Sequence, residues 1–350
     1  MNAMADLSSA APNILTVRDL KVHFPITRGV LRRKVGDVKA VDGISFEVRR
    51  AETLGLVGES GCGKTTTGRS LLRIVEPTAG SIVYRGRDGA EIDVGSADKA
   101  SLKRIRRDMR MVFQDPNSSL NPRLPVGEII GQGMEYAGMA KSEIEDRIAV
   151  LLRRVGLRPE YIRRYPHAFS GGERQRIGIA RALALNPAFV VCDEAVSALD
   201  VSVQAQILRL LRELKRELDL TYLFVGHDLA VIQHICDRVA VMYAGKLVEI
   251  APTRELFDFP KHPYTEALLS AVPRPDPRLR GRGTRIRLKG EVADVANLPT
   301  GCAFHPRCRY ATDLCRVETP PLRQVATGHV SACHYAETLP LAGVAAVTAS

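Results

Sequence analysis

The sequence has no long uncharged apolar run. A membrane-spanning helix needs roughly 20 consecutive apolar residues, and even the region 223–241 is interrupted by His227, Asp228, His234, Asp237 and Arg238. We therefore expect no spanning helix. The start of the chain, 1–13, lacks a basic segment leading into an apolar one. No secretory signal is expected, and the cytoplasm is the default location.

Length and composition are those of an ordinary globular protein. The 350 residues are 45% hydrophobic and 25% charged, enough for one large α/β domain and a smaller appendage. The net charge is +11, with basic runs at 99–110 and 274–289. Such an excess of positive charge is typical of proteins that bind nucleic acid, an anionic membrane face or phosphate ligands. It does not distinguish between these partners.

Apolar runs typical of buried strands alternate with helical patterns. The strands are expected at 14–22, 44–48, 53–57, 189–192, 221–225 and 239–243, with a loop at 28–38 and a hairpin at 80–86. Helices are expected from 63 to about 74 and at 142–155, 173–185 and 202–218. This alternation predicts an α/β fold with a largely parallel sheet. We predict a main domain at 14–255 with an inserted helical subdomain at about 115–172, a C-terminal extension at 256–335 and a disordered tail at 336–350.

Residues 58–65 match the phosphate-binding pattern GxxxxGK[ST] between an expected strand and an expected helix. We call this segment the phosphate loop. Its glycines let backbone N–H groups converge on phosphates, and the following helix N-terminus adds a positive dipole. Lys64 is expected to pair with the β and γ phosphates, and Thr65 to bind Mg²⁺. The alternative is a plain glycine-rich turn. The predicted nucleotide contacts from this segment are Gly58, Glu59, Ser60, Gly61, Cys62, Gly63, Lys64, Thr65 and Thr66.

Two further motifs fit phosphoryl transfer. A buried strand at 189–192 ends in Asp193 and Glu194, which places both acids at the edge where α/β proteins bind ligands. Asp193 would help to hold Mg²⁺, and Glu194 would polarise the attacking water. The segment 170–173, which we call the signature, could simply be a helix capping box. Its adjacent glycines favour close approach of a phosphate instead. The signature residues are Ser170, Gly171, Gly172 and Glu173.

In their order along the chain, these motifs resemble those of ABC ATPases over roughly 15–251. The resemblance implies a P-loop ABC-type nucleotide-binding domain that hydrolyses ATP, and two such domains facing head to tail. Each ATP would lie between the phosphate loop of one domain and the signature of the other. Gln114 would reach Mg²⁺ and the water, His227 the γ-phosphate, and Asp200 the dimer seam. Phe24 would stack on adenine, with a buried core aromatic as the alternative.

Within that family the chain is similar to the ATP-binding subunits of dipeptide and oligopeptide importers, the second ATPase of the pair more than the first. The segments that carry the likeness are 39–43, 118–123, 164–167, 201–206 and 262–265. The resemblance implies a paralogous ATPase partner, two permease subunits, an extracytoplasmic binding protein and a place on the cytoplasmic face of the membrane. Glu173 stands where Gln is usual and Ala195 where Pro is usual. Hydrolysis is still expected.

Four cysteines in the extension suggest a metal site. The sequence shows no signal peptide, so disulfides are not expected. Zn²⁺ sites usually show tighter pairs, and some similar importers carry an iron–sulfur cluster in this segment. The resemblance therefore favours a [4Fe–4S] cluster over Zn²⁺, with four unligated packing cysteines as the alternative. The expected ligands are Cys302, Cys308, Cys315 and Cys333, for which His305, His329 and His334 could substitute.

Two rival functions stay open from the sequence. The net charge and the cysteines suit a soluble ABC ATPase that works on nucleic acid, although no nucleic-acid partner is expected. Glu173 and Ala195 suit a regulatory module that holds ATP without hydrolysing it. Salt-dependent nucleic-acid binding tests the first rival, and ATP turnover tests the second.

Overall fold

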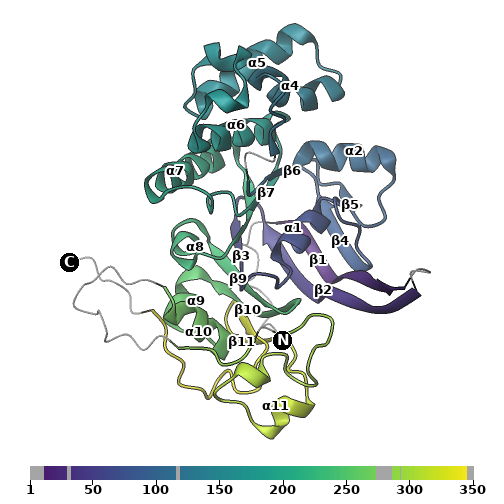
Figure 1. Ribbon diagram of the computed structural model, residues 1–350, viewed down its shortest axis with the longest axis vertical. Coiled ribbons are helices and arrows are strands. Elements are labelled where there is room, and N and C mark those ends of the chain that lie inside the picture. The colour runs from purple at the N-terminus through teal and green to yellow at the C-terminus, as the bar shows by residue number, and fades with distance from the viewer. Residues whose placement is uncertain (1–11, 30–32, 116–118, 273–285, 292, 345–350) are drawn as a thin grey trace, which may run out of the picture. The chain divides into compact units, whose positions relative to one another are not determined.

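Short, wholly buried strands form the centre of the fold. The structure is a computed structural model that describes residues 12–29, 33–115, 119–272, 286–291 and 293–344 (Figure 1). Two compact units are present. The first is built mainly from Val83–Val225 with Glu47–Glu52, and the second from Thr16–Phe46, Thr53–Ile82 and the chain after Gly226.

Three parallel strands form a sheet in the first unit. β7 (Phe189–Asp193) pairs with both β6 (Met109–Val112) and β8 (Thr221–Gly226), and every residue of β7 and β8 is buried. These strands confirm the expectation from their apolar runs, because a strand covered on both faces needs no polar side. The hairpin expected at 80–86 is displaced, because that segment is almost wholly one strand, β4 (Ala79–Arg85), which pairs with β5 (Glu91–Asp93).

Helices surround these strands within the first unit. α6 packs against β6, α7, α4 and α5, and α4 and α5 lie together at the top of Figure 1. The predicted helices at 142–155, 173–185 and 202–218 are present with ends shifted by one or two residues. The bounds are α2 Lys99–Asp108, α4 Val126–Tyr136, α5 Lys141–Arg154, η1 Pro159–Arg163, η2 Pro166–Ala168, α6 Gly171–Leu183 and α7 Val201–Leu218.

The second unit contains a mixed sheet. β3 (Thr53–Val57) runs parallel to β9 (Arg238–Tyr243), and β9 is antiparallel to β10 (Lys246–Pro252). The predicted extension adds two strands to this sheet, since β10 pairs with β12 and β12 pairs with β11. The remaining bounds are α1 Lys64–Leu71, α8 Leu229–Ile235, α9 Thr253–Asp258, α10 Pro263–Ser270, η4 His305–Arg307, α11 Asp313–Val317, β11 Arg323–Ala326 and β12 His329–Ser331.

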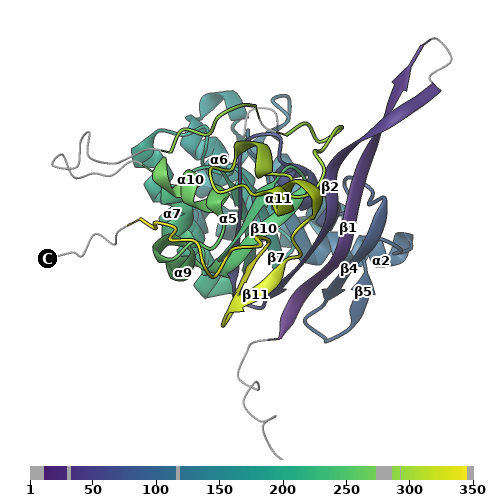
Figure 2. The same cartoon turned by 90° about the horizontal axis from the view of Figure 1, so that it is seen from below.

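The predicted loop at 28–38 is wrong for most of its length. β1 (Asn13–Arg28) and β2 (Arg33–Arg49) run side by side as a long ribbon (Figure 2). Much of the outer part of β2 is exposed or half-buried. The outer part of β2 is polar and basic, and its residues do not alternate between apolar and polar. The sequence therefore contains no signal from which this strand could be predicted.

Two other features of the described chain bear on the predictions. Part of the predicted tail is packed, since the amides of Ala342 and Val344 donate hydrogen bonds to Glu266 and to the carbonyl of Phe257. Residues 345–350 of that tail and the basic run at 274–285 lie outside the described residues.

Within the described part of the chain, no helix is both long enough and apolar enough to cross a membrane.

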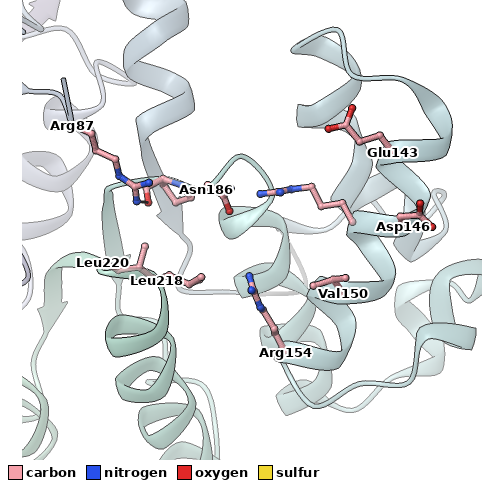
Figure 3. A pocket seen from close by; sticks show the side chains of 10 residues that line it. Arg87, Glu143, Asp146, Val150, Arg154, Asn186, Leu218 and Leu220 are labelled. Carbon is pink, nitrogen blue, oxygen red and sulfur yellow. Dashed lines mark hydrogen bonds between the residues drawn. The ribbon is translucent and has the colours of Figure 1, made fainter.

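A cavity of about 510 Å³ lies in the first unit between α5 and the segments around Asn186 and Leu218 (Figure 3). Basic and acidic side chains line it together. Arg147 and Arg87 are held by backbone carbonyls, donating to Ala184 at 2.6 Å and to Pro187 at 3.1 Å. None of the site residues predicted from the sequence lines this cavity.

Candidate nucleotide site

The phosphate loop joins β3 to α1 in the second unit, as predicted. Gly58, Gly61 and Gly63 have φ angles of 154°, 79° and 102°, which side chains rarely adopt. A Cβ on Gly58 would lie 2.1 Å from the carbonyl oxygen of Met242, and one on Gly63 would lie 2.0 Å from that of Ala40. The turn therefore needs glycine at both positions, because backbone atoms fill the space.

Lys64 is the first residue of α1 and is 5% exposed. Its ammonium donates to the carbonyl oxygens of Gly58 and Glu59, both at 2.8 Å. The cap residue of α1, Gly63, has no side chain to satisfy the first N–H groups of the helix. A fixed ammonium beside a helix N-terminus is a site for an anion. Thr65 follows directly, where the predicted Mg²⁺ ligand belongs.

Cys62 is a buried residue of the phosphate loop. Its side chain is 1% exposed, and burial raises the pKa of its thiol. A buried protonated thiol is a poor nucleophile and a poor metal ligand. Nucleotide contact by Cys62 stays a prediction.

Gln114 and Glu194 meet in the first unit. The Gln114 amide Nε2 donates to the Glu194 carboxylate at 2.9 Å, although the two residues are 80 positions apart. Glu194 has a φ of 46°, which is uncommon for a residue other than glycine and is often found at functional sites. Its backbone N–H donates to Val225 at 2.9 Å, which ties it to the end of β8. Asp193, one residue earlier on β7, is 1% exposed.

The signature forms a helix capping box, which was one of its two interpretations from the sequence. Ser170 Oγ accepts from the Glu173 amide at 3.3 Å, and the Glu173 carboxylate accepts from the Ser170 amide at 2.9 Å. Gly172 also has a packing reason that sequence reasoning missed. A Cβ there would lie 2.5 Å from Val203 Cγ1 of α7. Phosphate approach at these glycines stays a prediction.

The remaining predicted residues lie at the ends or on the surface of elements. Asp200 caps α7, accepting from the Val203 amide at 3.0 Å, and this hydrogen bond lowers its pKa. His227 follows β8 and is exposed. Phe24 lies on β1 and is 41% exposed, so it is not a core aromatic. Adenine stacking by Phe24 stays a prediction.

Comparison with known proteins identifies the family. Residues 41–197 match the model for "ABC transporter", and 248–315 match "Oligopeptide/dipeptide transporter, C-terminal region". The chain is 51% identical to the oligopeptide transport ATP-binding protein AppF of Bacillus subtilis, over 92% of this chain and 97% of the relative. It belongs to the ABC transporter ATPases. A probable peptide ABC transporter ATP-binding protein, y4tS of Sinorhizobium fredii, is 50% identical over 92% of this chain and 89% of its own.

Solved structures agree on the fold of this ABC ATPase. The cbiO1 protein of Clostridium perfringens, part of the ABC transporter complex cbiONQ, matches with a TM-score of 0.59 at 26% identity, over 70% of this chain and 90% of its own. An ATP-binding cassette solved as a dimer with ADP and Pi in a post-hydrolysis state matches with a TM-score of 0.59 at 25% identity, over 69% of this chain and 99% of its own. The predicted P-loop ABC fold is confirmed.

All four C-terminal cysteines line one small cavity in the second unit, with His305 and His334. His329 does not line it, because its Nε2 lies 2.7 Å from the buried carboxylate of Glu249. Burial raises the pKa of the Cys308 thiol to about 11 and that of Cys333 to about 12. A metal bound here would require these thiols to ionise, because metal ligands are thiolates.

The cysteine cavity is too small for an iron–sulfur cluster as it stands. Its volume is about 20 Å³, close to the space of a single water molecule. Among the described residues, no group of three or more His, Cys, Asp or Glu side chains could hold a metal ion. The predicted cluster is not supported by this arrangement, and no step of the mechanism is assigned to it.

The glycines of the phosphate loop give a paired test. Gly63→Ala should destabilise the chain by about 3 kcal/mol or more, because its Cβ meets a backbone oxygen that cannot move away alone. Gly61→Ala should cost only about 1–2 kcal/mol, the strain of the positive φ, since a Cβ at Gly61 meets nothing within 4 Å. Denaturant unfolding of both variants measures the difference. Equal losses of stability would contradict the steric argument.

Proposed function

We propose that this chain is the ATP-binding and ATP-hydrolysing subunit of an importer for dipeptides or oligopeptides. The observation that carries the proposal is the phosphate loop, with its glycine backbone packed on backbone oxygens and the Lys64 ammonium held inside it. The names of the relatives and the matched C-terminal region support peptides as the transported solute.

Hydrolysis in this proposal depends on positioning and charge, because phosphoryl transfer offers the protein little covalent chemistry. Loop amides and Lys64 hold the β and γ phosphates. Thr65, Gln114 and Asp193 would hold Mg²⁺, which would supply positive charge to neutralise the phosphates. Glu194 accepts a hydrogen bond from the attacking water and orients it. The Gln114 amide is placed to orient the Glu194 carboxylate, to which it donates.

A second ATPase domain completes each nucleotide site. We assign Ser170, Gly171, Gly172 and Glu173 to the ATP held by the partner's phosphate loop, and Asp200 to the seam between the domains. A cassette of related fold was solved as a dimer bound to ADP and Pi, which supports a pair of ATPase domains. ATP closes the pair and hydrolysis reopens it, driving the permeases between inward and outward states. We propose a paralogous ATPase as the partner.

The other proposed partners follow from the same assignment. Two permease subunits cross the membrane and receive the solute from an extracytoplasmic binding protein. This chain lies on the cytoplasmic face as a peripheral subunit. The names of the relatives favour this assignment over a nucleic-acid ATPase.

Neither departure from the family pattern argues against hydrolysis. Glu173 keeps the capping bonds to Ser170 that the signature helix needs. Ala195 is 1% exposed and packs where it stands. A module that binds ATP without turnover would also have no need of the contact between Gln114 and Glu194.

Two substitutions separate ATP binding from hydrolysis. In the assembled transporter, Lys64→Ala should weaken ATP binding at least tenfold, because it removes the fixed charge beside the phosphates. Glu194→Gln should keep ATP affinity within about threefold and lower turnover at least a hundredfold, because an amide polarises water poorly. Nucleotide titration and phosphate release measure the two effects. An unchanged affinity for ATP in Lys64→Ala would contradict the proposal.

The predicted [4Fe–4S] cluster stays a prediction beside this function, with Zn²⁺ as its alternative. A bound cluster would require the cysteine cavity to open from its present volume and the four thiols to ionise. Anaerobic purification followed by iron, sulfide and zinc analysis decides the matter. About four irons and four sulfides per chain would support the cluster, and four titratable thiols without metal would rule it out.

A further inference from the structure

The C-terminal extension contacts the phosphate loop through an ion pair. Arg307 Nη1 and Nη2 donate to the two carboxylate oxygens of Glu59 at 2.6 and 3.0 Å, across 248 positions of sequence. The two side chains are 7% and 27% exposed. We propose that Arg307 is a positioning residue for nucleotide binding, which holds the phosphate loop in its binding conformation and neutralises the carboxylate of Glu59.

Glu59 is held at its backbone as well as at its side chain. Its N–H donates to the hydroxyl of Tyr264 at 2.8 Å, and Tyr264 is fully buried. The Tyr264 ring packs against those of Tyr243 and Phe304, with centroids 4.7 and 5.4 Å away. An aromatic cluster with few rotatable bonds makes a rigid support. The second residue of the phosphate loop is therefore fixed from the side of the extension.

Arg307 is itself fixed by short-range structure. It ends the 3₁₀ turn η4, where its amide donates to the carbonyl of Phe304 at 3.0 Å. Its guanidinium lies 5.9 Å from the centre of the Tyr243 ring, within reach of a cation–π attraction. The hydrogen bonds to Glu59 raise the pKa of the guanidinium further above its usual value. A fork held in this way selects a carboxylate that presents both oxygens.

The charge of this pair matters because of what the loop binds. This inference rests on the proposed function, in which the triphosphate of ATP lies against residues 58–65. An unpaired Glu59 carboxylate would repel that triphosphate, since like charges a few ångströms apart interact strongly near a protein surface. Arg307 removes the repulsion, and by holding the Glu59 side chain it also helps to keep the Glu59 carbonyl on the Lys64 ammonium.

The neighbouring arginine offers a matched control. Arg309 lies two residues along the same segment and donates through Nη2 to both oxygens of Glu266 at 2.9 and 3.0 Å. Glu266 belongs to α10 and not to the phosphate loop. Loss of either arginine removes an ion pair of the extension, but only Arg307 touches the residue that lies against the nucleotide.

The test compares Arg307→Gln, Arg307→Lys and Arg309→Gln in the assembled transporter. Arg307→Gln should raise the KM for ATP about tenfold with kcat changed less than about twofold, because binding is lost and the hydrolytic groups stay. Arg307→Lys should recover part of the affinity, since the charge returns without the fork. Arg309→Gln should leave the KM unchanged. A KM in Arg307→Gln equal to that of Arg309→Gln would overturn the proposal.

A double-mutant cycle with Glu59→Gln separates a direct pair from a general loss of folding. Arg307→Gln with Glu59→Gln should bind ATP no worse than Arg307→Gln alone, because the repelling carboxylate is gone. Additive losses would contradict a direct pair. Lys64→Ala serves as the reference for the function itself. If Lys64→Ala abolishes ATP binding while Arg307→Gln does not weaken it, the proposed function stands and this inference fails.

Discussion

The phosphate loop is shaped by two backbone oxygens that leave no room for a side chain. The carbonyls of Met242 and Ala40 lie where a Cβ of Gly58 or Gly63 would stand. In the loop built on these glycines, two carbonyls, those of Gly58 and Glu59, accept hydrogen bonds from the Lys64 ammonium. The proposed binding of ATP depends on this backbone. The backbone N–H groups of the loop would donate to the phosphates, and Lys64 supplies the positive charge.

Support for the loop comes from several distant parts of the chain. Ala40 belongs to β2, Met242 to β9, and Tyr264 to α10. Arg307 adds a fourth support and, like Tyr264, belongs to the extension, whose strands β11 and β12 continue the sheet of the second unit. In this arrangement the extension is a structural part of the nucleotide site.

Short motifs with a mechanism of their own could be predicted from the sequence. The phosphate loop, the strand that ends in Asp193 and the helix after the signature all follow from local patterns of glycine, apolar and acidic residues. The roles of Gln114 and His227 needed the family resemblance. An isolated glutamine in a loop carries no pattern, and its contact with Glu194 depends on pairing between β6 and β7.

Other features could not be predicted, because they arise from contacts distant in sequence. The pair of Arg307 and Glu59 spans 248 positions, and neither residue type is unusual in its place. The packing of Gly172 on Val203 also depends on how α6 meets α7. The four cysteines were expected to gather, and they line one cavity, but its volume of about 20 Å³ follows from side-chain packing that spacing alone does not encode.

Hydrogen exchange of the full chain with and without Mg²⁺ and ATP tests the central claim most directly. If the loop amides grip the triphosphate, nucleotide should slow exchange at residues 58–67 and, through Arg307, at 304–309. The amides around Arg323 should not respond. Exchange at 58–67 that is unchanged by saturating ATP would contradict binding at this loop.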